Sequence, residues 1–600
     1  MANFYTDNDD IKFLFKHFDA KLLAEQLEEG FRFAEEFESA PANADEALEN
    51  YEMVLKSVGQ LSADFIAPRA EGVDRQGSTL NEDGSVSYAD GIFEDLEKLA
   101  KAEVMGFTLP HRFGGINFPN LVYSMAVEIV SRADTSLMNI FGLQGIGETI
   151  NTFASEEIKQ QYLHDFSAGK VTGAMVLTEP DAGSDLQAVN LKAFQDDNGN
   201  WLLHGVKRFI TNGCGEVLLV LARSEPDRSG GLGLSLFICD RGPTVRIRRL
   251  EDKLGIHGSP TCEIFFDNTP CQLIGERQRG LVTYVMALMN GARLGIGGQS
   301  MGVAQAAFNI ARDYAASRKQ FGVAIEKLPA VRDMIIDMQI AIETGRSLLY
   351  LTSITVDHEI HYSKCSENEH PDKDEAKNSK NEFRKYKRLA AMLTPMCKYY
   401  CSEMCNRVAY DAIQVLGGSG YMRDYASERH ARDARITTIY EGTSQLQVVA
   451  AIRGVCSGTA EKILTEMAEK KYDPKVKDLL KLLARGTKQM KKAIAFVKEN
   501  GNDYMDLYGR GIVDIAIDLI VGYLFCDQAS TKVDMQIAVS TERGKASGKT
   551  ISMKDRKAMV ARRFITKNAP KIKAITRTIR NGDKTTFEQY QNLVAPIVTE

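Results

Sequence analysis

The strongest constraint on the fold is a block of short β-branched and aromatic runs between two long helical blocks. Seven such runs fall within residues 171–270, among them WLLHGVKRFI and VLLVLARS, and Asp-Asn-Gly-Asn at 197–200 separates two of them. Gly and Asn tolerate the positive φ that a tight hairpin turn requires. The pattern predicts a compact antiparallel sheet domain within a mainly helical chain, which is an α+β fold.

Apolar residues recur at helical spacing on both sides of this block. The turn clusters at 69–81 and 110–120 interrupt the first helical block, and the charged stretch His358–Glu382 lacks an apolar stripe, so we expect an exposed loop there. A chain of 600 residues has room for about four domains. We expect an N-terminal helical extension over 1–40, a helical domain over 41–170, the β domain over 171–280, a helical bundle over 281–455 and an additional helical domain over 456–600.

Charge is unevenly distributed along the chain. The net charge is −6, but residues 451–600 contain 28 Lys and Arg against 17 Asp and Glu, so this part carries +11 and the first 450 residues carry −17. An acidic chain does not suit general nucleic-acid binding. The basic run 554–580, with Met559, Val560, Phe564 and Ile565 between its cations, would suit an anionic membrane surface or an acidic partner. A solvated helix face whose apolar stripe packs on its own domain is the favoured interpretation.

The sequence predicts a cytoplasmic protein without a membrane span. The longest apolar candidate, 512–525, is too short, and Asp514 and Asp518 within it mark the wet face of an amphipathic helix. The opening MANFYTDNDD is acidic, unlike a secretory signal or a mitochondrial presequence.

The ten cysteines form no CxxC pair, as expected in a reducing compartment. Three of them recur at every fourth residue of an apparent helix, but no fourth ligand lies nearby, so we interpret them as small core residues and predict no metal site. They are Cys397, Cys401 and Cys405.

Five segments carry residue types that suit ligand binding or catalysis. In TEPDAGSD, at the end of a strand, Thr178 and Ser184 offer short hydroxyl groups around a small turn. In KRFITNG, Phe209 and Thr211 alternate near a strand end, where an aromatic ring and a hydroxyl could line a flat heterocycle. Taken alone, the first segment is explained equally well by an ordinary polar turn, and the second is more often just a half-buried strand.

The third and fourth segments combine fixed donors with glycine. SRKQFG closes a long helix and could bind a phosphate or pyrophosphate, although a basic helix end followed by Gly is more often a cap. QVLGGSGY breaks a helix and permits close backbone approach, which alone is a weak signal. The candidate residues are Arg318, Gln320 and Phe321 in the former and Gln414, Gly417 and Gly418 in the latter.

The fifth segment, IYEGTSQ, contains the candidate base. Glu441 lies beside Ile439 and Tyr440 and directly before Gly442. A partly desolvated carboxyl group has a raised pKa and is a stronger base. The alternative is an acidic residue at the N-terminus of the helix that begins in TSQLQ, where the helix dipole favours it.

In their order and spacing, these five segments together resemble the acyl-CoA dehydrogenase family, over about residues 60–455. The opening YTDNDDIKFLF and the C-terminal extension are similar to a bacterial subgroup of about 600 residues that includes fatty-acyl-CoA and methylthiopropionyl-CoA dehydrogenases. The resemblance implies a helical domain, a β domain and a helical bundle, followed by an extra helical domain.

The resemblance also implies FAD as cofactor and a step of fatty-acid β-oxidation. Glu441 matches the base that removes the α-proton of an acyl-CoA while a hydride leaves the β-carbon for flavin N5. In the family, the backbone N–H of this Glu and a ribityl hydroxyl stabilise the developing enolate, and Gly442 allows that approach. Thr178, Phe209 and Thr211 match residues around the flavin, with Phe209 in place of a frequent Trp.

Further residues match contacts to the flavin, to CoA or to the adenosine half of FAD. Ser184 matches a contact on the flavin or CoA side. Arg293 matches a CoA-binding arginine, although Asn290 stands where Asp is common, and Ala292 stands where some members place their base instead. The residues that match FAD pyrophosphate and adenosine contacts are Arg318, Gln320, Phe321, Gln414, Gly417 and Gly418 for the neighbouring subunit's FAD, and Thr443 and Gln445 for its own.

The C-terminal extension resembles those of very-long-chain dehydrogenases and acyl-CoA oxidases, which implies a homodimer. Electron-transfer flavoprotein is the expected acceptor of the electrons. The alternatives are an acyl-CoA oxidase that uses oxygen and, less in keeping with an intact YEGT segment, a non-enzymatic DNA-binding member of the superfamily.

Overall fold

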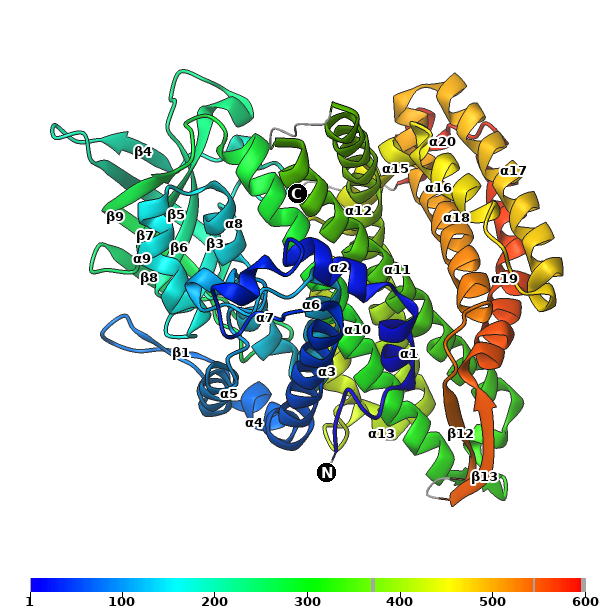
Figure 1. The fold of residues 1–600 in the computed structure, drawn as a ribbon. Helices are drawn as coiled ribbons and strands as arrows, with labels where there is room; N and C mark the ends of the chain where they lie inside the picture. The colour runs from blue at the N-terminus through cyan, green and yellow to red at the C-terminus, as the bar shows by residue number, and fades with distance from the viewer. Residues whose placement is uncertain (1, 368–372, 543–544, 595–600) are drawn as a thin grey trace. The chain divides into compact units, whose positions relative to one another are not determined.

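The computed structural model describes residues 2–367, 373–542 and 545–594. They form two compact units: one comprises Met1–Tyr386 and Cys397–Ser444, and the other comprises Lys387–Met396 and Gln445–Glu600. Figure 1 shows the elements of both. None of the helices in the described ranges is long and apolar enough to cross a membrane.

The apolar spacing predicted a helical block at the start of the first unit, and the residues described there form nine α-helices. A small hairpin of β1 (Thr79–Leu80) and β2 (Val86–Ser87) lies between the fourth and fifth helices. The helices are α1 (Asp9–His17), α2 (Ala20–Leu27), α3 (Ala44–Leu61), α4 (Ala70–Gln76), α5 (Asp90–Lys101), α6 (Asn120–Ala133), α7 (Thr135–Leu143), α8 (Ile146–Phe153) and α9 (Glu156–Ser167).

The seven predicted strands follow, and they form one sheet. They are β3 (Gly173–Val176), β4 (Lys192–Gln195), β5 (Trp201–Thr211), β6 (Val217–Arg223), β7 (Leu234–Asp240), β8 (Val245–Leu250) and β9 (Thr261–Ile274). The pairings are antiparallel except that β3 and β4 run parallel to β6, which corrects the prediction of a wholly antiparallel sheet. The expected hairpin joins β4 to β5, with Gly199 at φ +84°.

Strand β6 is buried on both faces, which explains its continuous apolar sequence VLLVLAR. Leu219 and Leu221 belong to a core shared with α8 and α9, whereas Leu218 and Val220 belong to the core on the other side of the sheet. The sheet is thereby fixed against the N-terminal helices, and its strand ends can carry a site.

After the sheet, the long helices of the first unit pack against the N-terminal ones, with α10 lying against α6 and α11. The elements are α10 (Met286–Ser317), the hairpin β10 (Lys319–Gln320) and β11 (Val323–Ala324), α11 (Pro329–Glu367), α12 (Lys373–Leu416), α13 (Gly418–Tyr421) and α14 (Ser427–Ile436). Residues 387–396 of α12 belong to the second unit.

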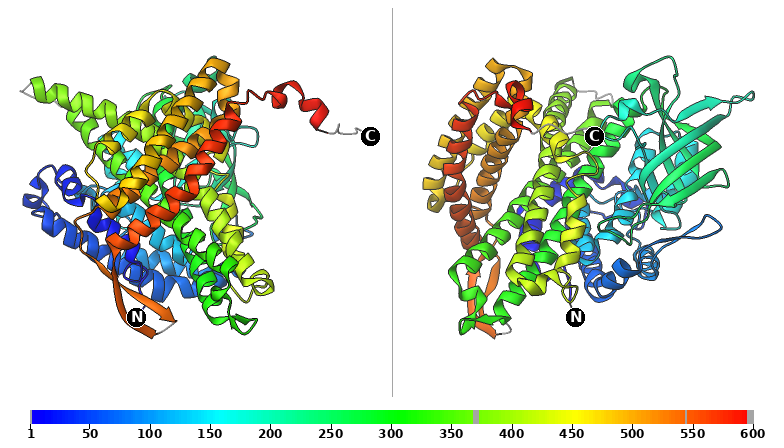
Figure 2. Two further views of the ribbon diagram at one scale, coloured as in Figure 1. Left: turned by 90° about the vertical axis from the view of Figure 1, so that its right-hand side faces the viewer. Right: turned by 180° about the vertical axis from the view of Figure 1, so that it is seen from behind.

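The second unit is helical, as predicted, with one hairpin that the sequence did not indicate. Its long helices α17, α18 and α19 pack against one another, and the hairpin projects beyond their ends (Figure 2). The elements are α15 (Ser444–Cys456), α16 (Thr459–Ala468), α17 (Lys477–Asn500), α18 (Asn502–Ala529), β12 (Gln536–Glu542), β13 (Lys545–Ser552), α19 (Met553–Ile579), α20 (Thr585–Glu588) and α21 (Tyr590–Leu593).

The predicted loop at His358–Glu382 is wrong. Its described residues continue α11 to Glu367 and begin α12 at Lys373, while 368–372 lie outside the described residues. The rings of His358 and Tyr362 both pack on Tyr386, with centroids 4.8 and 5.5 Å apart. A few aromatic contacts thus hold two charged helix ends together without an apolar stripe.

The turn predicted over residues 69–81 is also partly wrong, because α4 occupies its first half. Val73 is buried, and the helix ends only at Gly77, whose φ of +64° suits a residue without Cβ.

The wet face expected at Asp514 and Asp518 is only partly exposed to water. The side chain of Asp518 is half-buried, its Oδ1 accepts a bond of 3.3 Å from Asn568 Nδ2 on α19, and burial raises its pKa to about 7. Val560, Phe564 and Ile565 of α19 are buried within the second unit. This burial favours the solvated-face interpretation of the basic run.

A fully buried arginine joins three helices of the first unit. Arg346 on α11 donates to Asp10 Oδ2 and Glu128 Oε1, each at 2.6 Å, and all three side chains are almost inaccessible to water. Because each charge is paired and hydrogen-bonded, removal of one partner would leave an uncompensated charge in the core.

Arg346→Met should therefore destabilise the first unit by about 3–5 kcal/mol, measured by urea denaturation followed by circular dichroism. The control is Arg112→Met, which breaks the exposed pair with Glu156 and should cost less than about 1 kcal/mol. Equal effects of the two substitutions would contradict the role assigned to Arg346.

Candidate active site

A bulge in β5 presents Phe209 at the edge of the sheet. Pairing of β5 with β9 shifts register between Lys207 and Ile210, and Phe209 adopts φ +61° with half of its side chain exposed. The neighbouring Arg208 N–H donates to Thr178 O at 3.0 Å. Bulges commonly re-aim a side chain beside an active site. Here the bulge brings the segments of Thr178 and Phe209 together.

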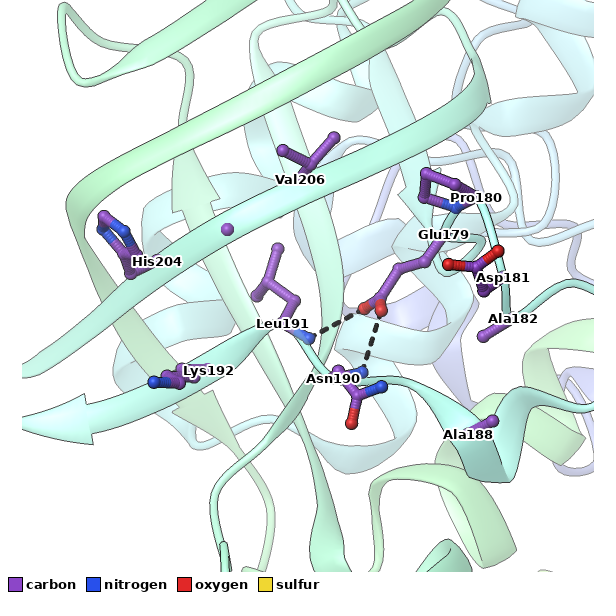
Figure 3. A pocket seen from close by; sticks show the side chains of 11 residues that line it. Glu179, Pro180, Asp181, Ala182, Ala188, Asn190, Leu191, Lys192, His204 and Val206 are labelled. Carbon is purple, nitrogen blue, oxygen red and sulfur yellow. Dashed lines mark hydrogen bonds between the residues drawn. The ribbon is translucent and has the colours of Figure 1, made fainter.

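The loop after β3 is fixed by a buried ion pair. Lys207 Nζ lies 2.9 Å from Glu179 Oε1 and donates to Leu177 O at 2.7 Å, and burial lowers the pKa of Lys207 to about 8. Figure 3 shows the Glu179 carboxylate accepting the backbone N–H groups of Asn190 and Leu191, at 2.8 and 2.9 Å. These contacts therefore hold both ends of the loop in place.

The same loop lines a cavity of about 350 Å³ with the start of β4 and the middle of β5. Its walls include Asp181, Lys192, His204 and Val206 (Figure 3). Ser184, between the fixed ends of the loop, is exposed and is not among the cavity residues.

Glu441 occupies a strained turn between α14 and α15. Its φ is +55°, and that of Gly442 is +87°. A left-handed conformation is unfavourable for a residue with a side chain, and such strain concentrates at functional sites. Tyr440 holds the turn: its hydroxyl donates to Gln299 Oε1 and, at 3.3 Å, to Asn139 Oδ1.

Burial and two cations set the protonation of Glu441. Burial raises the pKa of this carboxyl group to about 7, against the opposing effects of Lys398 and Arg293. Lys398 on α12 is fully buried and donates to Gly442 O at 2.7 Å. Burial lowers the pKa of Lys398 to about 7. The turn thus holds an acid and a base that both titrate close to neutrality.

Arg293 has a hydrogen-bond donor that no other side chain or backbone group of the described residues satisfies. Its Nη1 donates to Asn290 Oδ1 at 3.0 Å, so the amide of Asn290 provides one acceptor for the guanidinium. Burial lowers the pKa of Arg293, and among the described residues its buried Nε has no hydrogen-bond partner. A buried donor without an acceptor is costly, and an anionic or carbonyl ligand would satisfy it.

A chain of contacts joins the sheet end to the Glu441 turn. Thr211 pairs with Thr261, and the Asn212 N–H donates to Pro260 O at 2.7 Å. The next residue back, Ser259, accepts a bond of 3.5 Å from Asn139, which in turn meets Tyr440. Thr211 and Glu441, 230 positions apart in the chain, therefore lie at the two ends of one short network.

A second region gathers the ends of α10 and α12. Tyr314 OH donates to Ser419 Oγ at 3.3 Å, so the SRKQFG and GGSGY segments are neighbours. All six predicted residues here are exposed, Phe321 to 90% at the tip of the β10–β11 hairpin. They are Arg318, Gln320, Phe321, Gln414, Gly417 and Gly418.

Two predicted residues follow the turn. Thr443 is half-buried, and Gln445 is exposed in the first turn of α15, where Gln445 begins the second unit.

The sequence pattern did not indicate Lys398, Gln299 or Asn139. Lys398 lies in the run CKYYCSEMC, where only the cysteines drew notice, and these are buried, with Cys397 Sγ 3.9 Å from Cys401 Sγ. In the described ranges, no group of three His, Cys, Asp or Glu side chains is arranged to hold a metal ion.

Family models match most of the chain. The N-terminal, middle and C-terminal domains of acyl-CoA dehydrogenase match residues 49–170, 174–269, and 279–366 with 376–455. A fourth model, described as acyl-CoA dehydrogenase C terminal, matches residues 456–542. The chain belongs to the acyl-CoA dehydrogenase family. The resemblance inferred from the five segments is confirmed, as is the predicted α+β fold with its extra helical region.

Curated relatives of this acyl-CoA dehydrogenase family member are oxidoreductases by name. An acyl-CoA dehydrogenase of Bacillus subtilis is 32% identical over 61% of this chain and 90% of its own length. Acryloyl-CoA reductase (NADH) of Anaerotignum propionicum is 32% identical over 67% and 94%. The 3-methylmercaptopropionyl-CoA dehydrogenase of Ruegeria pomeroyi is 31% identical over 67% and 69%. The expectation of an oxidoreductase is confirmed.

Solved structures agree with the fold. A chain from the structure described as "Electron transferring flavoprotein of Acidaminococcus fermentans: Towards a mechanism of flavin-based electron bifurcation" has a TM-score of 0.59 and 30% identity, over 68% of this chain and 98% of its own. An acyl-CoA dehydrogenase of Bacillus anthracis complexed with FAD has a TM-score of 0.72 over 88% of each chain, at 21% identity, and so supports the fold alone.

Tyr440→Phe should loosen the Glu441 turn, because Gln299 Oε1 loses its donor, and lower stability by about 1–2 kcal/mol in thermal denaturation. Tyr410→Phe is the matched control, since Tyr410 is exposed on α12, and should change stability by less than about 0.5 kcal/mol. An unchanged midpoint for Tyr440→Phe would contradict the anchoring role of this hydroxyl.

Proposed function

We propose that the protein is an FAD-dependent acyl-CoA dehydrogenase that converts a fatty or related acyl-CoA thioester to the trans-2-enoyl-CoA, with Glu441 as the base. The observation that supports this most is the carboxyl group of Glu441 itself: it lies on a strained turn, under the influence of two cations, with its pKa raised to about 7. A base with such a pKa is ionised in useful amounts at neutral pH and is stronger than an exposed carboxylate.

The turn suits removal of a proton next to a thioester. An α C–H group is a weak acid, so the developing enolate oxygen needs a fixed donor, and we assign that role to the backbone N–H of Glu441. Gly442, at φ +87°, places no side chain beside the Glu441 carboxyl group. Arg293 supplies the unsatisfied donor that suits the CoA part of the substrate.

The end of the sheet fits a flat cofactor. Phe209 offers an exposed apolar ring, the Arg208 backbone ties it to the Thr178 loop, and Thr211 adds a short hydroxyl at the strand end. Ser184 lies exposed on the same loop. FAD bound here would supply the flavin ring that accepts the hydride from the β-carbon.

We also propose a homodimer that completes the FAD site. Phe321, Tyr421 and Met422 expose large apolar surfaces around the ends of α10 and α12. Exposed apolar surface of this kind marks an interface, and Arg318, Gln320 and Gln414 beside it provide polar donors for a pyrophosphate. Gly417 and Gly418 meet no other atom within 4 Å of a would-be Cβ, so they leave room for the adenosine part, with Thr443 and Gln445 serving the FAD of their own subunit.

Electron-transfer flavoprotein is the acceptor that we propose, in keeping with the structure of that description among the similar folds. Steady-state assays over a C4 to C16 acyl-CoA series, with oxygen and a dye acceptor compared, define the acyl group. The same assays distinguish dehydrogenase activity from acyl-CoA oxidase activity, since rapid turnover with oxygen alone would favour an oxidase.

Three further expectations stay predictions. They are the cytoplasmic location, the contact of residues 554–580 with an anionic membrane surface, and the domain boundaries. Lys571, Lys573 and Arg577 of α19 are exposed and would serve such a contact electrostatically, and Met559 on the same helix is also exposed. DNA binding stays the least favoured alternative, and salt-dependent retention on DNA tests it.

Glu441→Gln should retain FAD but lose acyl-CoA-driven bleaching of the flavin, measured anaerobically near 450 nm, because an amide cannot accept the proton. Asp518→Asn is the matched control: its carboxyl group also has a pKa raised to about 7, but it lies on α18 beside Asn568 and should leave bleaching unchanged. Normal bleaching by Glu441→Gln would refute the assignment of the base.

Phe321→Asp should weaken the dimer and lower the ratio of bound flavin to protein, because it places a charge at the tip of the exposed apolar region. Light scattering and the visible spectrum measure the two effects. Phe93→Asp on α5, where the ring is also mostly exposed, is the control and should alter neither. A fully dimeric, fully yellow Phe321→Asp protein would contradict the proposal.

A further inference from the structure

Lys398 is a buried cation of α12 whose ammonium group contacts the Glu441 turn directly. Its side chain is completely inaccessible to water, and Nζ donates to Gly442 O at 2.7 Å. A lysine is rarely buried unless its charge is paired. A backbone carbonyl satisfies one of its three donors but cannot balance its charge.

The acids that face Lys398 are few. Glu441 on the turn and Glu403 on the same helix both favour its charged form, whereas Arg293 on α10 opposes it. Glu403 already accepts a bond of 2.6 Å from Ser444 Oγ. Glu441 is the larger of the two influences, and it lies directly beside the carbonyl that Lys398 holds.

The turn at Glu441 and Gly442 needs a contact such as the hydrogen bond from Lys398 to hold its conformation. Glu441 and Gly442 both have positive φ, and a strained backbone persists only where its surroundings fix it. Tyr440 fixes one side of the turn through Gln299 and Asn139, and Lys398 fixes the other through the Gly442 carbonyl. The two contacts hold the peptide units on both sides of the Glu441 carboxylate.

We propose that Lys398 is a positioning residue for Glu441: its ammonium group holds the Gly442 carbonyl and thereby the strained turn, and its charge keeps the carboxylate ionised near neutral pH. This inference rests on the proposed function, because it assigns Lys398 to the base of that reaction.

The sign of the effect follows from the charges around the carboxyl group. Those that face it are Lys398, Arg293 and the hydroxyl of Tyr440, with Glu403 and Asp433 near its neighbours. Both cations stabilise the ionised form, so removal of Lys398 raises the pKa of Glu441. The rising limb of the rate against pH, which requires the ionised base, then moves to higher pH. Lys398 and Glu441 both titrate near 7. The midpoint of the rising limb is therefore an apparent pKa of the two groups together.

Three substitutions separate the charge from the hydrogen bond. Lys398→Gln removes the charge but retains an N–H donor for Gly442 O, Lys398→Met removes both, and Lys398→Arg retains the charge at every pH tested. The control is Lys557→Met, which removes another fully buried lysine, on α19 of the second unit. If Lys398→Met does not fold, Lys398→Gln alone tests the proposal.

The rate of flavin reduction by an acyl-CoA is measured against pH by anaerobic stopped flow. Lys398→Gln and Lys398→Met should shift the rising limb upward by about one pH unit, which is a roughly tenfold loss of ionised base below the limb. Lys398→Arg should show a limb no higher than that of the parent protein, and Lys557→Met should show no shift. A limb unmoved in Lys398→Gln, in protein that binds FAD normally, would overturn the proposal.

A second measurement does not depend on turnover. The carboxyl C=O band of protonated Glu441, identified as the infrared band that Glu441→Gln removes, is titrated with pH in each variant. It should persist to higher pH in Lys398→Gln. If the parent protein oxidises no acyl-CoA, the proposed function fails, whereas this titration still decides whether Lys398 controls Glu441: an unshifted band contradicts that control.

Discussion

A carboxyl group that is withdrawn from water must find a cation or take up a proton, and the turn at Glu441 depends on a balance between the two. Burial favours the protonated form, Lys398 and Arg293 favour the ionised form, and the pKa lies at about 7. The balance requires α10 to bring Arg293, α12 to bring Lys398, and Tyr440 to hold the turn in its left-handed conformation. The long helices of the first unit thus determine the chemistry of one side chain.

In the β domain, buried polar contacts keep a loop rich in small residues in one conformation. The Lys207–Glu179 pair is buried, and Glu179 also accepts two backbone N–H groups of residues 190 and 191. Charge-assisted hydrogen bonds therefore hold the two ends of the loop in place, while Ser184 between them remains exposed. Together with the bulge at Phe209, this rigid frame presents hydroxyl groups and one aromatic ring toward a ligand.

Most of the fold could be predicted from the sequence, because helical spacing and β-branched runs are local signals. The seven strands of residues 171–270 and the long C-terminal helices are where the periodicity predicted them. The charged ends of α11 and α12 could not be predicted, since they depend on the packing of Tyr362 against Tyr386 from another helix. Glu441 was recognisable from its neighbours in the chain. Lys398 was not, because its partner Gly442 lies 44 residues away and nothing nearby in the sequence signals the contact.

The exposure of Phe321 bears on how the protein would behave when it is scarce. A ring that is 90% accessible in a single chain is poorly placed for a monomer and well placed beneath a second copy. If that copy completes the cofactor site, retention of the yellow colour obeys mass action, and dilution alone would release flavin from wild-type protein. The holoenzyme would then depend on cellular abundance as well as on the supply of its vitamin.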